Sequence, residues 1–239
     1  MSSQTEAPTI QICGACGRGV PIDAHFCPAC STILPLGRPG DYYAFLGLPR
    51  KLNVDMTELE QRFRTLSRQF HPDYFYNRPA ADRRASLERS SYLNDAYRTL
   101  RQPSSRLEYL LKIEGLAAGG PQQASKQVPP ALLEEVFALN EELDEVRERR
   151  AAGEHEDLWK GRLERARAPI EAKRAEHEAE MTQLSAEWDA LLDSAGTPTG
   201  PAARRALLER LRDRFLERNY INNLLAGIAR ELGDEWPKS

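Results

Sequence analysis

Apolar residues with helical spacing define the central part of the chain. Between residues 56 and 70 they recur at intervals of four, three and four positions, which places them on one narrow face of a helix. A second run with a single apolar face covers residues 93–100. The two sets are Leu59, Phe63, Leu66 and Phe70, and Leu93, Ala96, Tyr97 and Leu100. We therefore expect two antiparallel helices that share a small core, with residues 71–81 as the exposed loop between them.

The C-terminal half is charged, and its pattern predicts three long helices near residues 130–150, 156–193 and 202–232. Pro169 falls inside the second of these and should kink it or divide it in two. Stretches rich in glycine and proline separate three modules, which span residues 10–34, 41–115 and 129–235. The expected fold class is all-α, with a helical hairpin and a three-helix bundle that follow a small cysteine-rich unit.

Composition narrows the classes of partner. The 239 residues carry a net charge of −3, and no run approaches the roughly 18 apolar residues that a membrane-spanning helix needs. The first ten residues lack the basic and apolar segments of a secretory signal. The charge balance disfavours a nucleic-acid surface. We expect a cytoplasmic protein with no membrane or nucleic-acid partner, or a mitochondrial matrix protein if the chain is a processed eukaryotic form.

The cysteine unit has the spacing of a metal site. Cys13 and Cys16 form one C-x₂-C pair, and Cys27 and Cys30 form a second pair ten residues later. Two such turns facing each other make a tetrahedral S₄ site. Disulfides or free thiols are the alternative, and disulfides are disfavoured in a chain without an export signal. We predict one structural zinc ion per chain, although S₄ geometry also suits iron.

Two residues next to these cysteines, Gly17 and His25, also have expected roles in the cysteine unit. Gly17 follows the first pair, at a point where the turn often needs a positive φ angle. His25 lies close to the second pair, but four cysteines already complete the coordination shell, so we expect it to be a solvated loop residue. Because a linker at residues 35–40 separates this unit from the next module, we expect the two cores to fold independently.

The loop between the two central helices begins His71-Pro72-Asp73, and Pro72 ends the preceding helix. That helix carries Gln61, Arg64 and Arg68 on the face opposite its apolar residues, and Arg62 nearby is a weaker candidate for the same basic set. A catalytic role for the His71 and Asp73 pair is the rival interpretation. No nucleophile lies near them in sequence, so we expect no enzymatic activity.

These motifs together resemble the J-domain of DnaJ-type co-chaperones. The resemblance rests on residues 41–48 (DYYAFLGL), the HPD tripeptide and residues 93–100 (LNDAYRTL). It implies that the HPD loop and the basic helix face bind a DnaK-type chaperone and stimulate its ATP hydrolysis. By this resemblance His71, Pro72 and Asp73 carry the activity, and Arg64 and Arg68 guide the encounter.

A wider resemblance covers about residues 12–150 and the final helix. Residues 106–115 (RLEYLLKIEG), residues 140–145 (NEELDE) and the cysteine unit are similar to the HscB family of iron–sulfur cluster co-chaperones, in its longer, metal-bearing form. The family joins a J-domain to a three-helix bundle and delivers an IscU-type scaffold protein to a DnaK/HscA-type chaperone. It binds the scaffold through an apolar patch, which the resemblance carries onto Leu133, Phe137, Glu141 and Phe215.

Two alternatives stay open at this point. Leu133, Phe137 and Phe215 could belong to the bundle core, because an aromatic residue at helical spacing is more often core than interface. The whole chain could be a general DnaJ-like protein that holds unfolded polypeptides, with the cysteines forming a client-binding zinc module. No function is assigned to residues 150–200.

Overall fold

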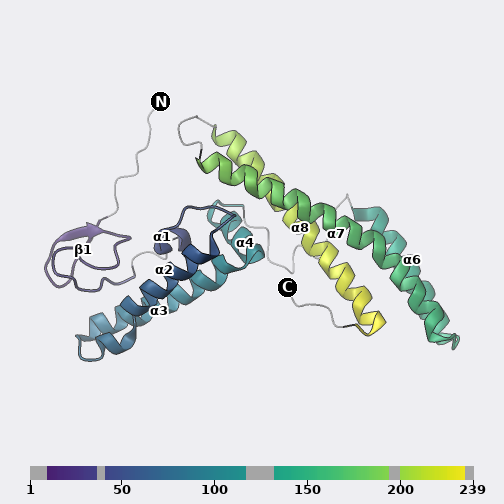
Figure 1. The fold of residues 1–239 in the computed structure, drawn as a ribbon, viewed down its shortest axis with the longest axis horizontal. Coiled ribbons are helices and arrows are strands. Elements are labelled where there is room, and N and C mark those ends of the chain that lie inside the picture. The colour runs from purple at the N-terminus through teal and green to yellow at the C-terminus, as the bar shows by residue number, and fades with distance from the viewer. Residues whose placement is uncertain (1–9, 37–40, 117–131, 194–199, 235–239) are drawn as a thin grey trace. The chain divides into compact units, whose positions relative to one another are not determined.

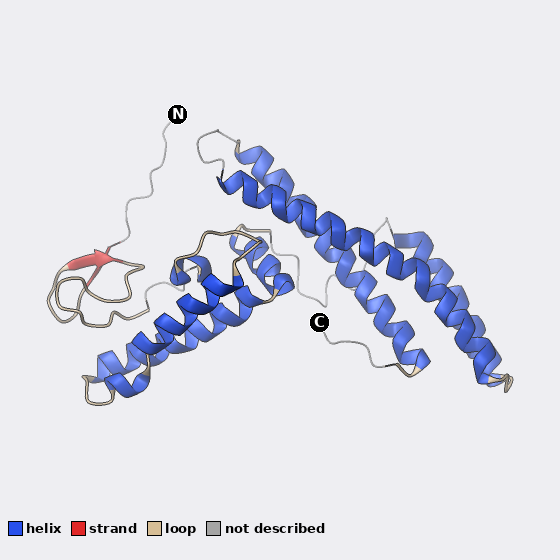
Figure 2. Ribbon diagram, viewed as in Figure 1, coloured by secondary structure: helices blue, strands red, loops and turns tan. Residues whose placement is uncertain are grey.

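The computed structural model describes residues 10–36, 41–116, 132–193 and 200–234, and these are largely helical (Figure 2). They form two compact units, one ending at Ile113 and the other beginning at Glu114 (Figure 1). The expected all-α class with a small cysteine unit is confirmed, since the only sheet among these residues is a two-stranded one near the N-terminus.

The first unit starts with a small antiparallel sheet. Strand β1 (Ile10–Ile12) pairs with β2 (Gly19–Pro21), with Gln11 opposite Val20. A second, shorter pairing joins Phe26 to Ile33. Each pairing closes a loop that carries one C-x₂-C pair, so the two turns have the same construction. Residues 10–36 are called the metal module below.

The helices of the first unit follow the apolar pattern. They are α1 (Tyr42–Leu46), α2 (Met56–Gln69), the short 3₁₀ helix η1 (Pro72–Phe75), α3 (Ala80–Arg101) and α4 (Pro103–Ile113). The side chain of Asp55 caps α2 by accepting from the backbone N–H of Thr57, as an N-cap aspartate should. Helices α2 and α3 lie side by side, and the predicted hairpin is confirmed (Figure 1).

The metal module has a small buried cluster of its own, formed by Cys13, Val20, Cys27 and Leu34, but it also contributes to the core of the helical part, so the prediction that the linker keeps the two cores separate is wrong. Ile33 of the module is buried together with Tyr43, Phe45 and Phe70 of the helical part, and Phe26 packs against the same cluster. A segment as short as residues 10–36 has few apolar side chains of its own, so it lowers its exposed apolar area by sharing the core of its neighbour.

The second unit contains three long helices, α6 (Leu133–Ala151), α7 (Glu156–Asp193) and α8 (Pro201–Leu232). Helix α7 packs against both α6 and α8. It passes through Pro169 without a break, so of the two predicted outcomes, a kink or a division, the division is wrong. Buried residues on both sides of the proline, among them Leu163 and Ile170, hold the helix against its neighbours.

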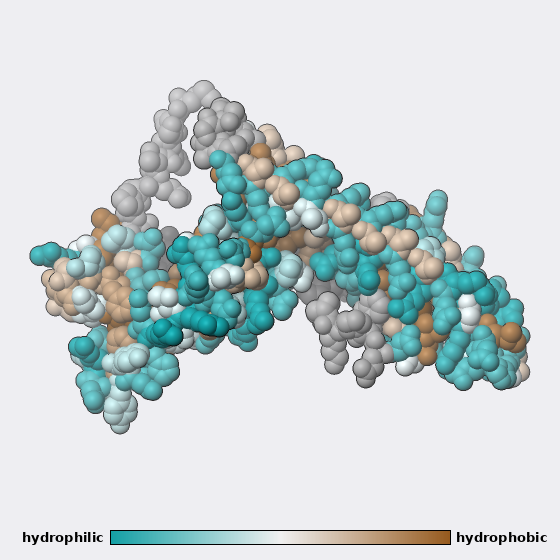
Figure 3. Space-filling view, viewed as in Figure 1, coloured by the Kyte–Doolittle hydropathy of each residue, from teal (hydrophilic) through white to brown (hydrophobic). Residues whose placement is uncertain are grey.

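The surface of the bundle is mostly hydrophilic in the view of Figure 3, with isolated apolar residues. Within the described ranges, no helix has the length and apolar character needed to cross a membrane.

Candidate functional site

The four cysteines come together as predicted. All four Sγ atoms lie within 4.8 Å of one another, with 3.6 Å between Cys13 and Cys30 and 3.7 Å between Cys16 and Cys27. A tetrahedral zinc site with Zn–S bonds of about 2.3 Å requires sulfur separations of about 3.8 Å. The four thiols therefore fit a tetrahedral metal ion with no open position, which suits a structural role.

The two cysteine turns share a backbone geometry. Gly17 and Ser31 each follow the second cysteine of a pair and have φ angles of 72° and 58°. Their N–H groups donate to the carbonyls of Cys13 and Cys27, at 2.9 and 2.8 Å. The positive φ predicted for Gly17 is confirmed, whereas Ser31 gave no such signal because it is not glycine.

Hydrogen bonding also prepares one thiol for a metal. Contacts with the Thr32 side chain and then its backbone lower the pKa of the Cys30 thiol to about 6. A metal-binding cysteine must be a thiolate, and this environment favours that form at Cys30. At Cys16 a hydrogen bond with the Arg18 backbone lowers the pKa, but burial and the neighbouring thiols raise it to about 11, so the four thiols do not share one environment.

The HPD loop is exposed. The side chains of His71 and Asp73 are 52% and 87% exposed, and His71 Nδ1 lies 3.5 Å from a carboxylate oxygen of Asp73. The N–H of Asp73 donates to the same Nδ1 at 3.3 Å, which leaves the proton of a neutral ring on Nε2. Pro72 occupies the first position of η1, where it fixes the backbone between the two polar side chains.

The basic face of α2 leads to this loop, but two of its cations already have partners. Arg62 pairs with Glu58 at 2.9 Å and Arg64 with Glu60 at 2.6 Å. Arg68 is exposed in the last turn of α2, one turn before the loop, and makes no ion pair with any residue that the structure describes. These surface pairs are weak and can exchange for a partner's carboxylates.

The residue before the loop is anchored from α3. Phe70 is fully buried, and its carbonyl accepts hydrogen bonds from the hydroxyls of Ser86 (2.6 Å) and Ser90 (3.0 Å). No sequence pattern reveals this anchor, because serine is common on exposed helix faces and its partner is far away in sequence.

His25 is a correction, since it is half-buried instead of solvated. Its Nδ1 lies 2.7 Å from a guanidinium nitrogen of Arg89, and its Nε2 lies 3.1 Å from the carbonyl of Phe45. Burial, followed by the charge of Arg89, lowers the pKa of His25 to about 4, so the ring is neutral at physiological pH. Arg89 was also missed, although its position four residues before Leu93 places it on the apolar face of α3.

The predicted scaffold-binding residues are divided between surface and core. Leu133 and Phe137 are 40% and 67% exposed, and Glu141, one turn further along α6, is also exposed. Phe215 is only 5% exposed on α8, in line with the buried residues Leu208 and Leu211, so its assignment to an exposed patch is wrong. The name α6 patch below means Leu133, Phe137 and Glu141.

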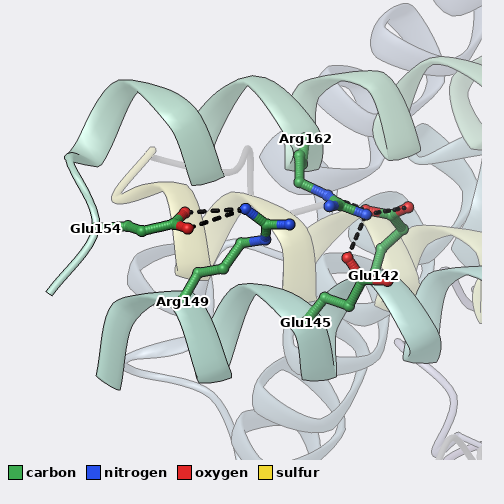
Figure 4. Close-up of polar contacts among 5 residues, drawn as sticks. All are labelled: Glu142, Glu145, Arg149, Glu154 and Arg162. Carbon is green, nitrogen blue, oxygen red and sulfur yellow. Dashed lines mark hydrogen bonds and ion pairs between the residues drawn. The ribbon is translucent and has the colours of Figure 1, made fainter. Parts of the chain in front are cut away.

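Ion pairs tie α6 to α7 outside this patch (Figure 4). Arg162 of α7 contacts Glu142 at 2.9 Å and Glu145 at 2.5 Å on α6, while Arg149 of α6 contacts Glu154, in the turn between the two helices, at 3.1 Å.

Comparison with known proteins supports the assignment of the parts. Residues 41–109 match the family model of the DnaJ domain. The crystal structure of the human co-chaperone protein HscB aligns with a TM-score of 0.60 and 23% identity, covering 92% of this chain and 98% of that one. The chaperone HscB from Vibrio cholerae aligns with a TM-score of 0.50 and 24% identity, covering 81% of this chain and 99% of that one. The chain therefore contains a DnaJ domain and has the fold of the HscB co-chaperones.

Proposed function

We propose that this protein is a non-enzymatic J-domain co-chaperone of iron–sulfur cluster assembly. It stimulates the ATPase of a DnaK/HscA-type chaperone through His71, Pro72 and Asp73, and it delivers an IscU-type scaffold protein bound at the α6 patch. The observation that carries the proposal is the exposed HPD loop at the end of a cation-bearing helix, inside the segment that matches the DnaJ domain.

The exposed groups fit recognition better than chemistry. Asp73 presents its carboxylate to solvent, and the exposed His71 ring can donate a hydrogen bond from Nε2. Pro72 holds both in a fixed relation. Arg68 supplies positive charge in the last turn of α2, and Arg64 lies one turn earlier, where it pairs with Glu60 and can exchange that carboxylate for a partner's. Such charges raise the encounter rate with an acidic partner surface and orient it.

The α6 patch supports the choice of a folded client. It offers two large apolar side chains with a carboxylate beside them on one helix face, the usual composition of a small protein interface. In the metal module, Phe26 and Ile33 pack into the core of the first unit, whereas Ile10 and Ile12 of β1 are exposed. Zinc bound by the four cysteines has a structural role, and we assign the protein to the cytoplasm, or to the mitochondrial matrix if it is a processed form.

The HPD loop can be tested with a control that the chain itself provides. His155 and Asp157 form a second exposed His-x-Asp pair, with His155 Nδ1 3.2 Å from Asp157 and exposures of 77% and 86%. We expect His71→Gln and Asp73→Asn to reduce chaperone ATP hydrolysis to the basal rate, while His155→Gln and Asp157→Asn leave stimulation unchanged. Exposed substitutions of this kind cost under ~0.5 kcal/mol of stability, so all four variants should melt like the parent. Full stimulation by His71→Gln would contradict the proposal.

The client can be tested by calorimetric titration with an IscU-type scaffold. Truncating two central contacts, in Leu133→Ala/Phe137→Ala, should weaken binding by roughly 30-fold, as expected for loss of about 2 kcal/mol at an interface hot spot. Leu158→Ala is the control, because Leu158 is 61% exposed on α7 of the same unit. Tight binding of many unfolded polypeptides, with no affinity for the scaffold, would favour a general DnaJ-like function instead.

A further inference from the structure

The HPD loop starts directly after Phe70, whose aromatic ring is enclosed by two parts of the chain, the metal module and the helices of the first unit. Phe70 immediately precedes His71, and its side chain is 0% exposed. From the metal module, the rings of His25 and Phe26 lie 5.1 and 5.9 Å from it, the first edge-on and the second stacked. From the helical part, Phe45 lies 5.9 Å away. Two of these three aromatic neighbours therefore belong to the metal module.

A buried arginine joins the same two parts. Arg89 on α3 is 2% exposed, and its guanidinium lies 5.7 Å from the centre of the Phe70 ring. Its Nε donates to the carbonyl of Leu34 at 2.7 Å, and one Nη donates to the carbonyls of Ala24 and Pro35, both at 3.1 Å. The other Nη donates to Nδ1 of His25 at 2.7 Å. Every one of these acceptors lies in the metal module.

The acceptors of Arg89 depend on the second cysteine turn. Residues 24–26 and 33–35 run past each other, joined by the Phe26–Ile33 pairing and by the N–H of Leu34 donating to the carbonyl of His25 at 3.0 Å. Cys27 and Cys30 close the end of this loop, where Cys27 N–H donates to the carbonyl of Thr32 at 2.9 Å. A metal ion on the four thiols would fix this end, whereas four unligated thiols leave it held by a few backbone bonds.

Arginine can only donate, so the contact also fixes the state of His25. Its Nδ1 must accept, and the proton of the neutral ring is therefore on Nε2, where it donates to the carbonyl of Phe45. The metal module thus contacts Phe45 of α1, Arg89 of α3 and the ring of Phe70 immediately before the loop. A buried guanidinium that loses its acceptors is costly, so Arg89 cannot stay in place if the module opens.

We infer that the metal module positions the HPD loop, with Phe26 and Arg89 as positioning residues that act on His71-Pro72-Asp73 through Phe70. The module is then a part of the chaperone-stimulating machinery, although none of its residues belongs to the DnaJ domain match. The part of this inference that concerns stimulation rests on the proposed function, and the part that concerns loop order does not.

Two variants separate positioning from simple packing. Phe26→Leu keeps the cysteines and the acceptors of Arg89 but removes the stacked ring, and Phe26→Tyr restores a ring whose hydroxyl can reach solvent because Phe26 is only partly buried. Arg89→Lys keeps the charge but loses the forked contact with several carbonyls.

The experiment compares metal-loaded protein, protein stripped by a chelator, and these variants, by amide hydrogen exchange and by chaperone ATPase. We expect exchange at residues 70–74 to rise at least tenfold in stripped protein, in Phe26→Leu and in Arg89→Lys, while amides near Leu93 and Ala96 in α3 stay protected. Maximal stimulation should fall at least threefold in the same samples and return with Phe26→Tyr.

Two results would overturn the inference. One is unchanged exchange at residues 70–74 after metal removal. The other is an equal rise across α3, which would make the module a general stabiliser. If metal-loaded parent protein fails to stimulate any DnaK/HscA-type chaperone, the proposed function fails, while the exchange result still decides whether the module orders the loop.

Discussion

The sequence resemblance places Phe137 of α6 and Phe215 of α8 on one client surface, but the structure predicts that their substitutions change the free energy of unfolding by different amounts. Phe215 is 5% exposed and Phe137 is 67% exposed. A buried phenylalanine removes on the order of 200 Å² from water, and at about 25 cal/mol per Å² this gives an upper estimate of about 5 kcal/mol. Phe215→Ala should therefore lower the free energy of unfolding by about 3–5 kcal/mol. Phe137 keeps only a third of its surface buried, so Phe137→Ala should cost at most about 1–2 kcal/mol.

Denaturant unfolding followed by tryptophan fluorescence measures this difference in the second structural unit, which contains both phenylalanines. All three tryptophans, Trp159, Trp188 and Trp236, lie after residue 114, so the signal does not report on the first unit. Phe215→Leu is the control, because a smaller change of apolar volume should cost less than about 1.5 kcal/mol. A loss below about 1 kcal/mol for Phe215→Ala, or equal losses at both positions, would refute the assignment of Phe215 to the core.

Two further predictions concern the metal and the pH. Protein produced with zinc and iron available should contain about one metal ion per chain, and Cys27→Ser/Cys30→Ser should lose it; a double variant with full metal content would refute the S₄ site. Burial lowers the pKa of His177 below its ordinary 6.5, against the opposing charge of Glu217 at 3.5 Å. The unfolded chain then binds the extra proton first, so bundle stability should fall between pH 7 and pH 5. His177→Gln should flatten this dependence, and an unchanged slope would contradict the assignment.

Much of the fold followed from local patterns. The apolar faces of residues 56–70 and 93–100 predicted the hairpin because helix periodicity and a proline stop are local signals. The paired C-x₂-C spacing predicted the sulfur cluster for the same reason. The predicted bounds of the three long helices in the second unit also lie close to the observed bounds.

The sequence-based predictions that are wrong, and the contacts that were not predicted, depend on residues from distant segments of the chain. Arg89 meets residues more than 50 positions away, and no local rule reveals that its acceptors are backbone carbonyls of another module. Phe215 and Phe137 have the same side chain at helical spacing, and only the packing of α8 against α7 decides which one is buried. Pro169 shows the same limit, since tertiary packing keeps α7 continuous against a strong local breaker.

A mixing experiment tests most directly the central claim that one chain presents its client to the chaperone. His71→Gln should bind the scaffold but not stimulate, and Leu133→Ala/Phe137→Ala should stimulate weakly without responding to the scaffold. Scaffold-dependent ATP hydrolysis by a DnaK/HscA-type chaperone is then measured with the parent, with each variant and with an equimolar mixture of the two variants. We predict that the parent gives strong scaffold-dependent hydrolysis and that the mixture does not, because delivery requires both surfaces on one chain. Hydrolysis by the mixture equal to that of the parent would contradict this account.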